Sequence, residues 1–339
     1  MKYKHIHDDY TGYITSIKDK ESTIDRRKND VQRYLDWCED TNTDPVDVDS
    51  QDMDAYIRSI LDYSPNSTAT LLSSVSMLYD WMANNRDYAL DTDPTAEISL
   101  EEDYEVKTNI PLYVTKLLKD GNDADDEDRI IKALPKARVE QILEHPGQPE
   151  LRNFLAISLL WQTAMRADEL ARVRIDNINR DRREIRIRSS KLNPDDHPEL
   201  YRRRVYYQPS LDKWLDMWLN EARPAYSKYA SDSPYLLLTD QNEQMRPSHI
   251  SRIVKRAAKR AGVQEPMYTD SAGKTRWLVT AHRIRHSTIS YWANHTDLDI
   301  NHIRRLAGHA KLETTLDYIS TSWKETREEY HASMRRAEQ

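Results

Sequence analysis

The sequence is poor in cysteine, and this scarcity excludes several kinds of site. Its 339 residues include one cysteine, Cys38, so no partner is available for an internal disulfide bond. A single thiolate also excludes zinc sites that need two or more cysteines. A chain without disulfides is typical of a reducing compartment, and we expect a cytoplasmic protein.

Long apolar runs are missing as well. No stretch of about 18 apolar residues occurs, so the sequence predicts no transmembrane helix and no membrane partner. The first residues, MKYKHIHDDYTGYI, lack the apolar core of a secretory signal peptide. The chain has six glycines and one phenylalanine but many aspartates, which is typical of a salt-adapted source such as an archaeon or its mobile element.

Two common catalytic motifs are also absent. The phosphate-binding loop GxxxxGK[ST] does not occur, which argues against nucleotide hydrolysis. His282 and His286 are four residues apart, as in a helical metal pair, but Arg283 stands where a zinc protease has glutamate. We therefore expect no metal ion and no cofactor, and we interpret His286 as a packing residue that supports its neighbours.

Charge is distributed unevenly along the chain. Residues 1–136 carry 16 Lys and Arg against 30 Asp and Glu, a net charge of −14. Residues 137–339 carry 34 against 27, a net charge of +7. An acidic half followed by a basic half indicates two modules, of which the second is suited to a polyanion. Arg26, Arg27 and Lys28 form a local basic face within the acidic half.

Helical periodicity dominates the first hundred residues. Apolar spacing predicts helices that open near Ser22, Ser50 and Ser67, with Ser64-Pro65 as a stop signal before the last of them. The acidic run DGNDADDED at 120–128 lacks a period. We expect a helical domain over residues 1–105 and a linker over 106–136.

The remainder, residues 137–339, reads as a second, mostly helical domain. One long apolar helix is interrupted near Thr163-Ala164. The segments 183–190 and 202–208 alternate apolar and charged residues, which predicts two antiparallel strands. The fold class expected for the whole chain is mainly α, with one small antiparallel sheet in the second domain.

Three separated stretches of the second domain carry polar residues suited to a phosphodiester. They are TAMRADEL at 163–170, HRIRH at 282–286 and LAGHAKLETTLDY at 306–318. Arg166 and Arg285 can bind phosphate oxygens through two hydrogen bonds each at any working pH. Tyr318 is the available nucleophile, and a tyrosine needs a base or strongly cationic surroundings because its ordinary pKa is about 10.

Spacing within these stretches adds two expectations. His282 and Arg285 are three residues apart and share a helix face. Glu169 follows Arg166 by three residues, so its carboxylate can hold the guanidinium in one orientation; the alternative is an ordinary surface ion pair.

Together the stretches resemble the conserved boxes of tyrosine recombinases of the phage integrase and Xer class. The family pattern is TGxRxxEL, a lysine on a β-hairpin, HxLRH, and LGH followed by TTxxY. Ala164 replaces the usual glycine here, and Lys191 follows the first predicted strand. No other lysine occurs before Lys213, so Lys191 is the best match to the hairpin lysine, with Arg202, Arg203 and Arg204 as its competitors.

The resemblance implies a SAM-like helical core-binding domain followed by a catalytic tyrosine-recombinase domain. Tyr318 would attack the scissile phosphorus of double-stranded DNA at a specific core or att-type site. The resemblance assigns further catalytic roles to Arg166, Lys191, His282, Arg285 and His309. It also implies a homotetramer on two DNA sites, acting through a Holliday junction, from a protein that is monomeric in free solution. The C-terminal tail would pack on a neighbouring protomer.

DNA contacts are expected from two basic groups. One comprises Arg26, Arg27 and Lys28, and the other Arg202, Arg203 and Arg204. Two other functions remain open: relaxation of DNA in the manner of type IB topoisomerases, and sequence-specific DNA binding without catalysis. Integration, excision and chromosome-dimer resolution are not distinguished by the sequence.

Overall fold

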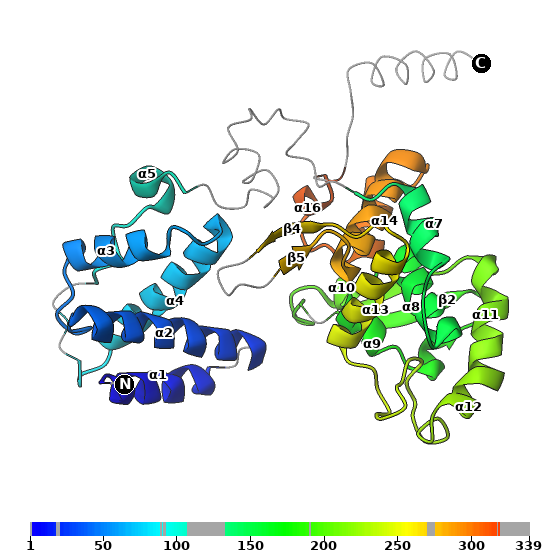
Figure 1. The fold of residues 1–339 in the computed structure, drawn as a ribbon, viewed down its shortest axis with the longest axis horizontal. Helices are drawn as coiled ribbons and strands as arrows, with labels where there is room; N and C mark the ends of the chain where they lie inside the picture. Colours follow the sequence, from blue (N-terminus) through cyan, green and yellow to red (C-terminus); the bar gives the residue numbers. More distant parts are fainter. Residues whose placement is uncertain are drawn as a thin grey trace, which may run out of the picture. The chain divides into compact units, whose positions relative to one another are not determined.

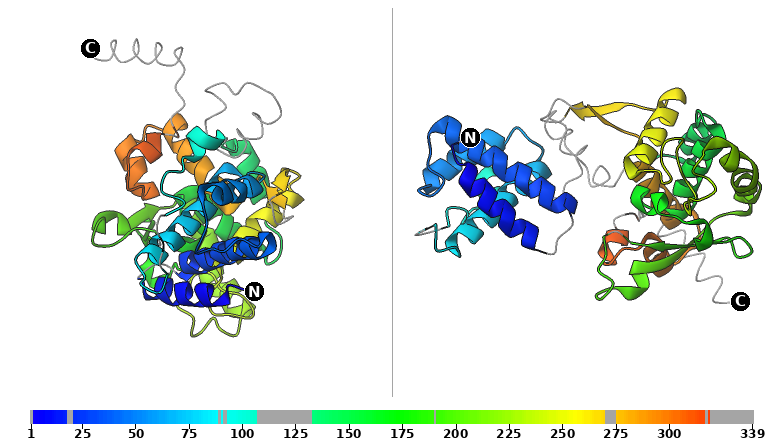
Figure 2. Two further views of the ribbon diagram at one scale, coloured as in Figure 1. Left: turned by 90° about the vertical axis from the view of Figure 1, so that its left-hand side faces the viewer. Right: turned by 90° about the horizontal axis from the view of Figure 1, so that it is seen from below.

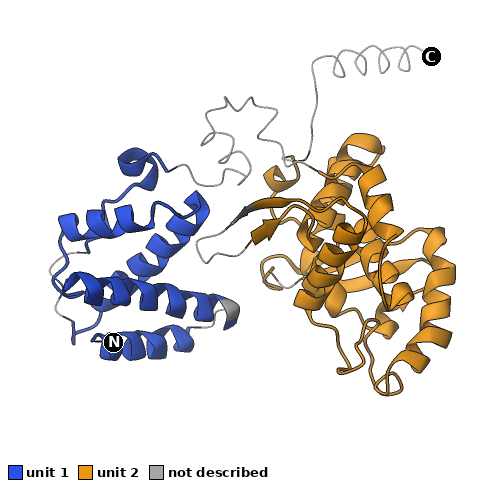
Figure 3. Ribbon diagram, viewed as in Figure 1, with its two compact units in different colours: residues 1–123, 269–274 blue, residues 124–268, 275–339 orange. Residues whose placement is uncertain are grey.

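The chain folds into two compact units. The computed structural model describes residues 2–17, 21–88, 90, 93–106, 133–189, 191–269, 275–316 and 318. One unit comprises residues 1–123 with 269–274, and the other comprises 124–268 with 275–339 (Figure 3). The described residues are mostly helical, which confirms the mainly α class. The predicted linker at 106–136 lies largely outside the described residues, which resume at 133.

The first unit is an α-helical assembly. Its helices are α1 (Lys4–Ser16), α2 (Glu21–Thr41), α3 (Ser50–Ile60), α4 (Pro65–Ala83) and α5 (Leu100–Tyr104). In Figures 1 and 2, α1 and α2 lie side by side, and α2 also packs on α4. Tyr34 lies at the centre of the core and meets Tyr56 edge-on, with ring centroids 4.7 Å apart.

Three helices of this unit begin at residues other than those predicted. Ser22, the predicted cap of α2, lies inside that helix, which includes Glu21. Asp49, not Ser50, caps α3, because its Oδ1 accepts hydrogen bonds from the backbone of Gln51 and Asp52 at 2.8 and 2.9 Å. The predicted stop at Ser64-Pro65 is wrong. Ser64 is the cap of α4 and Pro65 its first residue, a position where the missing N–H of proline has no helical acceptor.

The second unit holds the remaining elements. Its helices are α7 (Lys136–Leu143), α8 (Glu150–Thr163), α9 (Ala167–Ala171), α10 (Pro198–Tyr201), α11 (Asp212–Met217), α12 (Arg223–Tyr226), α13 (Pro247–Arg260), α14 (Ala281–His295), α15 (Ile300–Ala307) and α16 (Glu313–Leu316). Short turns η2 (Ile175–Asn177), η3 (Pro209–Leu211) and η4 (Trp218–Ala222) connect some of them. The long apolar helix α8 packs against α14, and α13 packs on α7, α9 and α14. The predicted interruption near Thr163-Ala164 is present, since α8 ends at Thr163.

A three-stranded antiparallel sheet lies beside these helices. Its order is β1 (Ile178–Asn179), β2 (Glu184–Arg188) and β3 (Arg202–Tyr206), and the predicted pairing of the last two is confirmed. Side chains alternate along β3, so Arg203 and Val205 are buried while Arg202, Arg204 and Tyr206 are exposed. The sequence did not predict the hairpin of β4 (Pro266–Thr269) and β5 (Thr275–Trp277), whose strands are too short to show a period.

Within the described ranges, no helix is both long enough and apolar enough to cross a membrane.

Candidate active site

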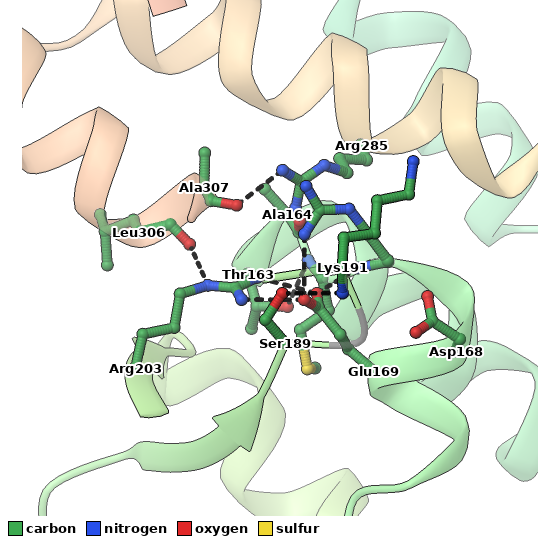
Figure 4. A network of polar contacts seen from close by, with 12 residues as sticks. Thr163, Ala164, Asp168, Glu169, Ser189, Lys191, Arg203, Arg285, Leu306 and Ala307 are labelled. Atoms are coloured by element: carbon green, nitrogen blue, oxygen red, sulfur yellow. Dashed lines mark hydrogen bonds and ion pairs between the residues drawn. The ribbon is translucent and has the colours of Figure 1, made fainter. Parts of the chain in front are cut away.

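The three polar stretches of the sequence meet in the second unit. Arg166 precedes α9, while His282, Arg285 and His286 lie on α14. His309 follows the glycine turn after α15. Tyr318 follows α16. Figure 4 shows Arg285, Glu169 and Arg203 of this region.

Arg285 forms hydrogen bonds with residues of the other two polar stretches. Its side chain is 3% exposed and donates hydrogen bonds to the carbonyl of Ala164, to the carbonyl of Ala307 at 2.6 Å and to Nε2 of His309 at 3.2 Å. Burial, followed by the charge of Arg166, lowers the pKa of Arg285 to about 9, so the group is charged at neutral pH. Arginine has five N–H donors, and these three contacts leave two for a phosphate.

Ala164 owes its position to an uncommon backbone conformation. Its φ of +50° places it in the left-handed region, where the C-cap of α8 turns the chain toward Arg166. Glycine adopts this region without strain, which gives a physical reason for the glycine of the family pattern. The alanine accommodates the same turn and presents its carbonyl to Arg285.

Glu169 is the anionic centre of the site. Its fully buried carboxylate contacts Nη1 of Arg166 at 3.1 Å, and its Oε2 accepts from the backbone N–H of Arg166 at 2.8 Å. The i,i+3 ion pair inferred from spacing is therefore present, and its carboxylate is buried rather than at the surface. Burial alone would raise the pKa of Glu169, but the hydrogen bonds and charge of Arg203, followed by the charge of Arg166, lower it to about 2.

Arg203 differs from its two neighbours on β3. Its Nη1 and Nη2 each bind one oxygen of Glu169 at 2.8 Å, and its Nε donates to the carbonyl of Leu306 at 2.9 Å. Figure 4 shows this guanidinium between α9 and α15. A side chain that is 4% exposed and bound in this way does not face DNA, so the prediction of a DNA contact is wrong for Arg203.

Gly308, in the stretch LAGHAKLETTLDY, is needed for the close approach of Arg203 to α15. Gly308 has a φ of +68° and ends α15. A Cβ atom at this position would lie 2.9 Å from the guanidinium carbon of Arg203. Glycine therefore allows both the turn that presents His309 and the close approach of the arginine.

Replacing Arg203 by methionine should destabilise the protein by about 3–5 kcal/mol, because the buried Glu169 carboxylate loses its bidentate partner. Arg204→Met on the exposed face of β3 is the matched control and should change stability by less than about 0.5 kcal/mol. Thermal unfolding measures both.

The same ion pair predicts a pH dependence. The pKa of Glu169 in the folded protein, about 2, lies below the ordinary value of about 4.3, so its stabilisation is present above that value and is lost as pH falls toward 2. Arg203→Met should weaken this acid sensitivity. Equal stability of the two variants at neutral pH would contradict the role given to Arg203.

His309 accepts rather than donates at the nitrogen nearest Arg285. An arginine can only donate, so the 3.2 Å contact makes His309 Nε2 the acceptor and places its proton on Nδ1, which meets Thr315 Oγ1 at 3.0 Å. Burial, followed by the charge of Arg285, lowers the pKa of His309 to about 3, which keeps the ring neutral. In this arrangement His309 orients Arg285 and has no N–H directed at a phosphate.

Tyr318 is buried beside these groups. It is 4% exposed and packs with Ala164, Ile289, Ile303 and Ala307. Its hydroxyl contacts Nδ1 of His286, and the two rings stack with centroids 5.3 Å apart. His286, interpreted from sequence as a packing residue, is therefore a direct partner of the tyrosine.

His282 is the next ring after His286. The Nε2 atoms of the two histidines are 2.6 Å apart, and the rings meet edge-on with centroids 4.1 Å apart. Although the His282 ring reaches the surface, desolvation within the site, followed by the charge of Arg285, lowers its pKa to about 4. Burial, followed by the neighbouring His282, lowers the pKa of His286 to about 2. Both rings are neutral at neutral pH.

Lys191, Arg202 and Arg204 occupy exposed positions. The backbone N–H of Lys191 donates to Ser189 Oγ at 3.2 Å, and its exposed side chain contributes to the lowered pKa of His282. Figure 4 includes Lys191 with its Ser189 contact. Arg202 and Arg204 are exposed on β3, where Arg204 lies 3.4 Å from Glu184.

The basic group of Arg26, Arg27 and Lys28 lies in the first unit, residues 1–123. Arg26 is exposed on α2, while Arg27 and Lys28 are half-buried there. Among the described residues, no three histidine, cysteine or acidic side chains gather where a metal ion could bind.

Comparison with known proteins identifies the family of this arrangement. The phage integrase family model matches residues 132–325. Tyrosine recombinase XerC 2 of Ralstonia nicotianae is 25% identical over 324 residues, 92% of this chain and 78% of the relative. Tyrosine recombinase XerA of Pyrococcus furiosus is 28% identical over 207 residues, 59% of this chain and 62% of the relative.

Solved structures show the same fold. The Tn1549 transposon integrase in complex with a circular intermediate DNA has a TM-score of 0.66 at 14% identity, covering 97% of this chain and 98% of that chain. A lambda integrase dimer bound to a core site has a TM-score of 0.63 at 14% identity, covering 94% and 95%.

The mostly helical second unit thus brings a buried tyrosine together with two arginines and three histidines. The chain belongs to the phage integrase family, whose model matches more than half of it. It is a tyrosine-type site-specific DNA recombinase.

Proposed function

We propose that this recombinase cleaves and rejoins DNA through a covalent 3′-phosphotyrosyl link formed by Tyr318. The observation that carries the proposal is the position of the Tyr318 hydroxyl, which contacts a neutral histidine inside a group of buried cations. A phenol needs both a proton acceptor and positive charge to attack a phosphodiester near neutral pH. The arrangement supplies both without a metal ion.

Each cation of the site would have its own role in the reaction. Arg285 and Arg166 would bind the nonbridging oxygens and stabilise the charge of the pentacoordinate transition state, where one donor contributes about 3–4 kcal/mol. His309 holds Arg285 in place through Nε2. Lys191 would protonate the departing 5′ oxygen. His282 would serve as the base for the proton that Tyr318 loses.

The covalent link conserves the energy of the broken bond, so no nucleotide cofactor is required. The 5′ hydroxyl of a second strand can then attack the phosphotyrosine and release Tyr318. Pairwise exchange on two DNA sites proceeds through a Holliday junction and needs four protomers, which gives a homotetramer on DNA from a monomer in solution. Solved relatives bound to core-site and circular-intermediate DNA support double-stranded DNA as the partner. We place this activity in the cytoplasm.

Exposed cations would provide the electrostatic part of DNA binding. Arg202 and Arg204 project from the solvent side of β3. On α2, Arg26 is exposed and the half-buried Arg27 and Lys28 follow it in sequence. Each phosphate that such a residue neutralises releases counterions, so DNA affinity should fall as salt rises.

A plasmid assay separates recombination from the two other functions. Supercoiled plasmid carrying two copies of the cognate site should yield exchanged products, whereas a plasmid without the site should keep its supercoiling. Relaxation of both plasmids without exchange would indicate a topoisomerase-like activity. Binding without any change of topology would indicate a DNA-binding protein only, and either outcome would overturn the proposed function.

A further inference from the structure

Three side chains form a continuous row in the site. Tyr318 Oη contacts His286 Nδ1, and His286 Nε2 lies 2.6 Å from His282 Nε2. Both histidines come from α14 and are separated by one helical turn. The row therefore begins at the buried nucleophile and ends at a ring that reaches the surface.

The protons of the row follow from its geometry. When Tyr318 donates its hydrogen bond to His286 Nδ1, neutral His286 carries its own proton on Nε2. That N–H then points at His282 Nε2, which must be the acceptor, so neutral His282 carries its proton on Nδ1. His286 uses one donor and one acceptor, His282 uses one acceptor, and both hydrogen bonds run in the direction from Tyr318 to His282.

We propose that His286 takes the proton of Tyr318 directly and passes its own Nε2 proton to His282, so that the two histidines act as a relay. The inference rests on the proposed function and deepens it, because it assigns the acceptor of the tyrosyl proton to His286. As the bond from Tyr318 Oη to phosphorus forms, the bond from phosphorus to the 5′ oxygen breaks. The tyrosyl proton arrives on His286 Nδ1, a second proton leaves His286 Nε2 for His282, and Lys191 supplies the proton that the 5′ oxygen takes.

The relay moves the new positive charge away from the half-buried His286 to the more exposed His282. His286 is neutral before and after the transfer, and the new positive charge resides on His282, the member of the pair nearer the surface. The positive neighbours that disfavour a charged His282 in the free protein include Arg285, Lys191 and Arg166. A bound phosphodiester, which becomes more negative in the transition state, offsets these charges.

Two substitutions at His286 separate a relay from a mere hydrogen-bond partner. In His286→Asn the amide oxygen can accept the hydrogen bond of Tyr318, but the side chain cannot accept a proton at one atom and release another. In His286→Phe a planar ring, larger than imidazole, is kept and both nitrogens are lost. We expect both variants to cleave site DNA about 10²–10³-fold more slowly in single-turnover experiments, a typical contribution of proton transfer by a side chain.

Solvent isotope measurements provide a readout that packing does not change. The cleavage rate of the wild-type protein should depend on the deuterium fraction with the curvature of two protons in transfer. His286→Asn should show a linear dependence. His302→Asn on the exposed side of α15 is the matched control and should retain the wild-type rate.

Substrates with a 5′-bridging sulfur distinguish the two ends of the reaction. The sulfur leaves without protonation, so Lys191→Ala should regain most of its rate on this DNA while His286→Asn should stay slow. A wild-type rate for His286→Asn, with unchanged DNA binding, would overturn the relay. If the wild-type protein itself forms no adduct, the proposed function fails instead, and the two failures are therefore distinct.

Discussion

Tyr318→Phe should abolish the covalent protein–DNA adduct while folding and DNA binding stay close to those of the wild type. Phenylalanine keeps the packing against Ala164 and Ile303 but has no hydroxyl to attack phosphorus. The lost hydrogen bond to His286 should lower stability by only about 1 kcal/mol. A denaturing gel with end-labelled site DNA measures the adduct.

His309→Ala is the comparison for this experiment. The adduct should still form, more slowly, since Arg285 loses one acceptor but keeps the carbonyls of Ala164 and Ala307. An adduct that persists in Tyr318→Phe would show that another residue is the nucleophile. Tyr330, the next tyrosine in the sequence, would be the first to test.

Arg285→Lys should reduce cleavage by about 10³-fold even though the positive charge is kept. The guanidinium reaches Ala164, Ala307 and His309 from one planar group, and an ammonium on a single nitrogen cannot span the same partners and a phosphate. Single-turnover cleavage at saturating protein measures the change in the chemical step.

Stability must be measured alongside this variant because Arg285 also holds two backbone segments together. Arg166→Lys is the companion variant: Arg166 has its Glu169 contact and a partly exposed side chain, so it should lose cleavage with little loss of melting temperature. Near-normal cleavage by Arg285→Lys would show that charge alone suffices and that the fork geometry is unimportant.

The sequence predicted the polar groups of the site better than their partners. Tyr318, Arg285 and His309 could be singled out because their types and order match a family pattern, and the helix spacing correctly placed Glu169 beside Arg166. Carbonyl acceptors such as Ala164 and Ala307 carry no residue-type signal, so no pattern could reveal them.

Arg203 could have been assigned correctly from one available signal. Along β3 it has the same parity as Val205, which marks the inward face, whereas a count of three consecutive arginines suggested a uniform basic patch. His286 is different, because its contact with Tyr318 depends on where the chain after α15 returns. Long-range placement of this kind is not encoded in local spacing.

The existence of a helix was easier to predict than its first residue. Apolar periods predicted α4 and α8, but the predicted start of α4 was wrong because Ser-Pro can end one segment or begin the next. Whether a serine or aspartate becomes an N-cap depends on the direction of the backbone at that residue. The residue type alone does not give this direction.

The bond between Arg285 and Ala164 joins residues 121 positions apart, which has a consequence during synthesis of the chain. Ribosomes add about 5–20 residues per second, so Ala164 emerges roughly 6–24 s before its partner arginine. Until the chain beyond α16 has been translated, the nascent polypeptide lacks Tyr318, the proposed nucleophile. A growing chain that has not reached this residue should therefore be unable to cut DNA.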